Sequence, residues 1–269
     1  MAAACLSHGD TLAAEGRLQE AIDAYKQAVR LQGDNPENHT RLGDAYLFAE
    51  ESSQALTHYR RALQANPYHA DTHFSLAEVY RRFGKLKGAI TLYRKAVDLE
   101  PRNPFYRYRL AAACHQSGKT EEAIRELREA IRLAPRDGFY RFWLGDLYLQ
   151  CDRIVEGVVE LEEAVVNAPF DDYYCVRLAM AYALVARNED AVVIFQRAIR
   201  LRPQSATYHC LLADAFARMG FALRAALHYE IAGDLDPFDR EYVHRMRQRT
   251  VGGLARATRE ELGLSPAAD

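Results

Sequence analysis

Apolar and small residues recur along this chain with a period of 34 positions. The period ends on a proline that appears six times, at Pro67, Pro101, Pro135, Pro169, Pro203 and Pro237. A second series contains only alanine, at Ala28, Ala62, Ala96, Ala130, Ala164, Ala198 and Ala232. A third series contains only glycine or alanine, at Gly9, Gly43, Ala77, Ala111, Gly145, Ala179 and Ala213. Random sequence does not keep several series in register, so the pattern predicts a tandem repeat.

Within each period the apolar positions fall into two helical patterns. The second period shows the order L-G/A-x2-Y…A-x3-Y/F/L-x2-A-x4-P in Leu42, Gly43, Tyr46, Ala55, Tyr59, Ala62 and Pro67. Spacings of three and four place these side chains on one face of each of two amphipathic helices, A and B. The small residues allow close helix approach, and the proline cannot continue helix B. Glycines stand between A and B in four periods, where a positive φ is often needed: Gly16, Gly84, Gly118 and Gly220.

This 34-residue unit resembles the tetratricopeptide-repeat family. The resemblance implies an all-α solenoid, a right-handed superhelix of seven antiparallel helix pairs followed by a C-terminal capping helix. The expected units are 2–35, 36–69, 70–103, 104–137, 138–171, 172–205 and 206–239. The capping segment is expected at 240–262, because stacked repeats need a polar end face, and a disordered tail at 263–269.

One repeat position departs from the family pattern. Where the family has its first aromatic residue, this chain has Cys5, His39, His73, Arg107, Arg141, Cys175 and His209. The contact that helix A makes at this position is therefore expected to differ from that of the family.

Charge and composition reduce the range of functions that the chain is expected to have. The chain has 35 basic and 37 acidic residues, which provides no general positive field for nucleic acid or an anionic membrane. A basic cluster occurs only at the end of the chain, in Arg240, Arg245, Arg247 and Arg249. No stretch approaches the roughly 18 apolar residues of a membrane span, and the N-terminus resembles no signal peptide. The five cysteines form no CxxC pair, which is typical of reduced thiols, so a cytoplasmic location is expected.

In the family, the concave surface is lined by helix A, at the second, fifth, sixth, ninth, twelfth and thirteenth positions of each unit. The ninth position is acidic in five of seven units: Asp10, Asp44, Glu78, Ala112, Asp146, Met180 and Asp214. Two interpretations of these acids stay open: local ion pairs such as Glu78 with Arg81 or Arg82 and Arg41 with Asp44, or a negative ladder that faces a ligand.

Aromatic residues gather at the groove positions of units four to six. They serve either packing between repeats or recognition, because aromatic residues and arginine are enriched in binding hot spots. The predicted peptide-binding surface comprises Asp44, Glu78, Phe105, Tyr108, Arg109, Phe139, Phe142, Trp143, Asp146, Tyr173 and Arg177. Tyrosines at the third position are expected instead to pack between units: Tyr106, Tyr140, Tyr174 and Tyr208.

The expected partner is therefore a protein or peptide segment with basic and apolar side chains. Some family members bind acidic chaperone tails through a two-carboxylate clamp, but its first positions hold Leu6 and Asp10 here, and the acids would repel a carboxylate.

Catalytic and metal-binding patterns are absent from the sequence. It contains no HExxH, GxSxG, P-loop or GxGxxG motif. The pair His69 and His73 has the i,i+4 spacing of metal ligands, but it straddles the turn between two units. No cofactor, metal or enzymatic activity is expected.

These features favour a protein–protein interaction scaffold that binds partner peptides in its groove. Two alternatives stay open: a self-assembling module that forms a dimer or oligomer, and the repeat domain of a larger enzyme such as a glycosyltransferase. Nucleic-acid binding and membrane binding are disfavoured by the charge balance.

Overall fold

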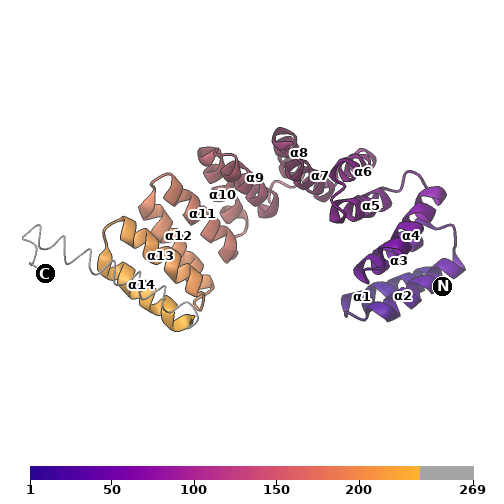
Figure 1. Cartoon of the computed structure of the whole chain (residues 1–269), viewed down its shortest axis with the longest axis horizontal. Helices are drawn as coiled ribbons and strands as arrows, with labels where there is room; N and C mark the ends of the chain where they lie inside the picture. The colour runs from indigo at the N-terminus through magenta and orange to yellow at the C-terminus, as the bar shows by residue number, and fades with distance from the viewer. Residues whose placement is uncertain (237–269) are drawn as a thin grey trace, which may run out of the picture. The chain divides into compact units, whose positions relative to one another are not determined.

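The computed structural model describes residues 1–236, and over those residues it consists of α-helices joined by short turns (Figure 1). The A helices are α1 Ala2–Ala14, α3 Pro36–Phe48, α5 Ala70–Arg82, α7 Pro104–Gln116, α9 Gly138–Gln150, α11 Asp172–Leu184 and α13 Ala206–Arg218. The B helices are α2 Leu18–Leu31, α4 Ser52–Ala65, α6 Leu86–Leu99, α8 Thr120–Leu133, α10 Ile154–Asn167, α12 Asn188–Leu201 and α14 Ala222–Leu235. The all-α architecture of antiparallel helix pairs is confirmed. The predicted capping segment 240–262 and tail 263–269 lie outside the described residues.

Most A helices begin at a side-chain cap. The carboxylate or amide oxygen of Asn35, Asp137 and Asp171 accepts a hydrogen bond at 2.9 Å from a backbone N–H of the first turn. Pro36 and Pro104 occupy the first helical position, where a missing N–H costs nothing. Each cap contributes about 1 kcal/mol and starts helix A at a defined residue.

The A–B turns need one residue with positive φ. The four predicted glycines have φ between +69° and +80°, which confirms their role. In the other three turns the same position is held by a residue with a side chain: Glu50, Asp152 and Ala186, with φ of +62°, +60° and +59°. Such a residue carries a steric cost of roughly 1–2 kcal/mol that glycine avoids.

Within a pair, the small residue of helix A lies against a large ring of helix B. A Cβ added at Gly43 would stand 2.6 Å from the ring of Tyr59, and one added at Gly9 would stand 2.5 Å from that of Tyr25. The tyrosine therefore packs on bare backbone, and both helices approach closely. Tyr59 is fully buried, as are the alanines that flank it on α4.

The position that departs from the family pattern contacts helix B of its own pair, 19 residues further on. His39 and His58 face each other with their Nδ1 atoms 3.0 Å apart, and His209 and His228 repeat this arrangement at 3.0 Å. In two other pairs the same positions form ion pairs, Arg107–Glu126 at 2.9 Å and Arg141–Glu160 at 3.1 Å. In these four pairs the position therefore makes a polar contact with helix B.

The chain divides into two compact units, residues 1–135 with α1–α8 and residues 136–236 of the described chain with α9–α14. Buried side chains of neighbouring pairs form shared cores, one that joins α1–α5 and one that joins α9–α14. Two of the tyrosines expected between repeats contact the A helix before their own: the hydroxyl of Tyr106 donates to Asp71 on α5, and that of Tyr208 donates to Asp172 on α11 at 2.5 Å.

Candidate functional site

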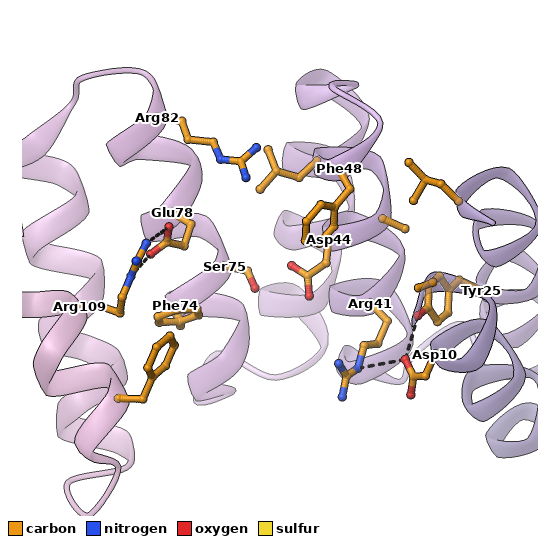
Figure 2. A pocket seen from close by; sticks show the side chains of 15 residues that line it. Asp10, Tyr25, Arg41, Asp44, Phe48, Phe74, Ser75, Glu78, Arg82 and Arg109 are labelled. Carbon is orange, nitrogen blue, oxygen red and sulfur yellow. Dashed lines mark hydrogen bonds and ion pairs between the residues drawn. The ribbon is translucent and has the colours of Figure 1, made fainter. Parts of the chain in front are cut away.

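The first unit contains an open cavity of about 720 Å³ on the side formed by its A helices. Figure 2 shows the side chains that line it, which come from α1, α3, α5 and α7 with two from α2. They are Asp10, Ala13, Leu18, Tyr25, Arg41, Asp44, Ala45, Leu47, Phe48, Phe74, Ser75, Glu78, Arg82, Phe105 and Arg109. Most of these residues occupy the groove positions that the family resemblance implies.

The structure places only part of the predicted binding surface at this cavity. Asp44, Glu78, Phe105 and Arg109 line it. Tyr108 is buried, and its ring lies 6.0 Å from that of Phe105.

The apolar part of the lining is aromatic. Phe48 is 71% exposed and Phe105 is 44% exposed. Phe74 is partly buried, and its ring lies 5.6 Å from that of Phe105 and stacks at 5.0 Å on Tyr106. Buried neighbours thus hold Phe74 and Phe105 in place, while Phe48 stands in the open. Exposed rings beside a concavity are typical of protein-interaction sites.

The acids at the ninth repeat position are called the ladder acids here, and most of them accept a hydrogen bond from helix B. Where a tyrosine stands 15 residues after the acid, its hydroxyl donates to the carboxylate. The distance is 2.8 Å from Tyr25 to Asp10 and 2.7 Å from Tyr59 to Asp44. The same contacts join Tyr93 to Glu78 and Tyr229 to Asp214. Sequence reasoning missed this partnership, although the constant spacing of acid and tyrosine was a usable signal.

A second partner comes from the next A helix, 31 residues further along. Arg109 Nε lies 2.7 Å from Glu78 Oε1, and the second guanidinium nitrogen contacts the other carboxylate oxygen. Arg41 lies 3.9 Å from Asp10. The acids of the ladder are thus largely occupied by the protein itself.

The predicted local pairs are partly right. Glu78 does meet Arg81, at 3.1 Å. The predicted pair of Arg41 with Asp44 is wrong, because Arg41 instead contacts Asp10 and Glu37, each at 3.9 Å. Long side chains on a helix lean toward its N-terminus, which carries the guanidinium away from a residue further along the helix.

The two acids at the centre of the cavity differ in their electrostatics. Burial raises the pKa of Asp44 above its ordinary value, and hydrogen bonds from Tyr59 and Ser75 offset this only in part. Burial alone would also raise the pKa of Glu78, but hydrogen bonds from Arg109 and Tyr93 hold it below its ordinary value. Of these two acids, Asp44 is therefore the one whose negative charge is less well stabilised by its neighbours.

The aromatic residues predicted for the second unit form a connected cluster. Phe142 is only 6% exposed, and it stacks on Tyr174 at 4.5 Å. Tyr173 is 54% exposed and its ring is tilted 5.5 Å from that of Phe142. Trp143 is 37% exposed and meets the rings of Phe142 and Phe139 edge-on. Phe142 therefore packs between repeats, while Trp143 and Tyr173 present surface, and a binding role for them stays a prediction.

Asp146 and Arg177, the charged residues predicted for the same surface, pair with each other. Both side chains are largely buried, and burial lowers the pKa of Arg177. This pair repeats the arrangement of Glu78 with Arg109 in the first unit.

Among residues 1–236, no group of three or more His, Cys, Asp and Glu side chains is placed to hold a metal ion. Within residues 1–236, which include all five cysteines, no disulfide bond is formed. None of the described helices combines the length and apolar character needed to cross a membrane.

Models of repeat families match about half of the chain. Models described as TPR repeat or tetratricopeptide repeat match residues 9–47, 107–172 and 173–205. A model described as anaphase-promoting complex, cyclosome, subunit 3 matches residues 51–130. A search of the curated proteins found no match.

Solved structures with similar folds share little sequence with this chain. The pilF protein of Pseudomonas aeruginosa is 22% identical with a TM-score of 0.63, over 79% of this chain and 97% of that one. A tetratricopeptide repeat protein of Parabacteroides merdae is 17% identical with a TM-score of 0.60, over 93% of this chain and 98% of that one. YrrB, described as a TPR protein with an unusual peptide-binding site, is 19% identical with a TM-score of 0.55, over 68% of this chain and 94% of that one. At this identity the likeness concerns the fold alone.

Proposed function

This chain is a tetratricopeptide-repeat protein, and from that premise we propose that it binds a peptide segment of a partner protein in the cavity of its first unit. Repeats of this family are generally protein–protein interaction modules. The fold is shared by many proteins and does not select a partner, so the proposal rests on the residues of the site.

The observation that carries the proposal is the cavity itself. It is walled by four A helices, it is large enough for several side chains, and it combines exposed rings with a partly buried carboxylate. Peptide sites are built in this way, with apolar anchors and a few polar groups that fix orientation. The described peptide-binding site of the YrrB structure supports this use of the fold.

A non-enzymatic role agrees with the comparisons. The matched family models describe repeats or a subunit of a complex, and none describes a catalytic domain. Membership of a larger enzyme and a cytoplasmic location stay predictions.

The test uses two tryptophan substitutions on adjacent exposed alanines. Ala13 lines the cavity and Ala14 does not, although both lie at the end of α1. A displayed library of random peptides is selected on the unaltered chain, and the enriched peptides are then measured on Ala13→Trp and Ala14→Trp. We expect binding to survive Ala14→Trp and to fall at least tenfold, about 1.4 kcal/mol, with Ala13→Trp, because the indole fills the cavity. Enrichment of no peptide, or equal binding to both variants, would contradict the proposal.

Self-association is a second candidate function, favoured by an apolar stripe on the second unit. Val159, Val193 and Leu227 occupy the same position of successive B helices and are 51%, 58% and 55% exposed. The first unit has only polar residues at this position, in Asp23, Thr57, Thr91 and Arg125. Sedimentation of the unaltered chain and of Val193→Lys over a range of concentrations tests this. A mass that stays that of a single chain at every concentration would exclude it.

A further inference from the structure

Three of the ladder acids follow a rule in which the next A helix supplies their cation. Asp10, Glu78 and Asp146 each form an ion pair with an arginine 31 residues later. These arginines are Arg41, Arg109 and Arg177. The rule is independent of the rest of the site, because it holds in both compact units.

Asp44 breaks this rule. The residue 31 positions later is Ser75, whose short side chain bears no charge. The carboxylate accepts a hydrogen bond at 2.7 Å from the hydroxyl of Tyr59, and the hydroxyl of Ser75 helps to lower its pKa. Within residues 1–236 no basic side chain lies within ion-pair distance of it. Asp44 is thus an acid of the ladder that has no cation from the described part of the chain.

The basic residues of the cavity lining are Arg41, Arg82 and Arg109, and none of them forms an ion pair with Asp44. Arg41 is turned away, toward Asp10, as Figure 2 shows. Arg82 lines the same cavity from the last turn of α5 but forms no ion pair with Asp44. Where the rule holds, the arginine occupies the space in front of the acid; at Asp44 that space is part of the open cavity.

We infer that Asp44 binds the guanidinium of an arginine side chain from the bound peptide, in the place where Asp10, Glu78 and Asp146 hold an arginine of this chain. The inference rests on the proposed peptide-binding function and names its partner's chemistry. An acid surrounded by hydroxyl donors still has acceptor capacity, and a planar guanidinium satisfies a carboxylate with two parallel hydrogen bonds. Phe48, Phe74 and Phe105 line the same cavity and offer apolar surface to the residues beside that arginine.

The peptide test exchanges charge without changing shape. The peptides are those selected on the unaltered chain that lose binding to Ala13→Trp. Each is resynthesised with one arginine at a time replaced by citrulline, a neutral isostere. One exchange is expected to weaken binding at least tenfold on the unaltered chain and less than twofold on Asp44→Asn. Arg82→Gln serves as a matched control that removes a charge from the cavity and leaves Asp44 in place, and it is expected to retain the full effect of the exchange.

The outcomes separate the inference from the proposed function. Peptides that depend on the cavity but contain no arginine, or that tolerate every exchange, would overturn the inference and leave the peptide-binding function standing. A lysine in place of the critical arginine is expected to bind several-fold more weakly, because an ammonium lacks the planar fork. Equal binding of the lysine peptide would overturn the assignment to a guanidinium.

A second test needs no peptide. Ser75→Arg places an arginine where the rule expects one, so it should pair with Asp44 and block the site from within. We expect it to raise Tm, and we expect this gain to disappear in Ser75→Arg combined with Asp44→Asn. A change in Tm that is the same with and without the Asp44 carboxylate would show that the site does not accept a guanidinium, and the inference would fail.

Discussion

Replacing Arg109 by glutamine should destabilise the first unit by about 2 kcal/mol near neutral pH. The side chains of Arg109 and Glu78 are 22% and 15% exposed, so the pair is largely removed from solvent. Breaking a fully buried pair costs roughly 3–5 kcal/mol, because it leaves a buried charge without its partner. Here Glu78 keeps Arg81 at 3.1 Å and the hydroxyl of Tyr93, which reduces the expected loss.

The matched control is Arg41→Gln, which removes the equivalent arginine from Asp10. That pair is 3.9 Å apart, and its side chains are 47% and 43% exposed. An exposed pair of this kind contributes at most about 1 kcal/mol and often nothing measurable. Urea unfolding followed by far-UV circular dichroism should therefore separate the two variants clearly.

The effect of Arg109→Gln should shrink in acid. The pKa of Glu78 is held below its ordinary value in the folded protein. A depressed carboxylate pKa stabilises the fold above the unfolded-state pKa of about 4.3, and that stability is lost as the pH falls through the folded-state pKa. The difference between the variant and the unaltered chain should thus be large at about pH 7 and should shrink as the pH falls toward about 3. An equal loss at both pH values would mean that Arg109 acts through packing rather than charge.

Three further predictions concern the described core and turns. Ala186→Gly should stabilise the chain by about 1 kcal/mol in urea unfolding, because Ala186 has a φ of +59°; no gain would mean that the turn is not strained. The His39–His58 pair should make stability fall by about 1–2 kcal/mol as the pH drops from about 6.5 to about 5, because burial lowers the pKa of His58 to about 4 and that of His39 as well. His58→Leu should remove much of this dependence. Leucine fits the position, because Leu92 stands there in the third repeat. An unchanged pH profile would show that other groups cause the dependence. Phe142→Ala should cost about 3 kcal/mol, measured through the single tryptophan, Trp143; a loss below about 1 kcal/mol would show that Phe142 does not pack as described.

The sequence predicts the helices well because each is encoded locally. A proline closes helix B, a polar cap opens helix A, and small residues at a fixed position mark the face where the two helices meet. Four positive-φ glycines are predicted for the same reason. The other three turns hold Glu50, Asp152 and Ala186, whose side chains give no signal of an unusual backbone.

The candidate site was harder to predict because its contacts join different helices. The count of aromatic residues points to units four to six, yet the structure turns Phe142 inward onto Tyr174. The cavity lies around the acids of the earlier units, where Phe48 and Phe74 contribute the apolar surface. The pairs at spacings of 15 and 31 were present in the sequence, but their meaning depends on how helix B and the next A helix pack against the acid.

The measurement that tests the central claim most directly is photo-cross-linking from the mouth of the cavity. A photoreactive phenylalanine analogue replaces Phe48, which is 71% exposed and lines the cavity, or Tyr68, which is 77% exposed and does not line it. In the presence of a selected peptide, we expect a cross-link from position 48 that is lost on adding Ala13→Trp, and none from position 68. A cross-link from position 68 alone, or one from position 48 that survives Ala13→Trp, would contradict the account.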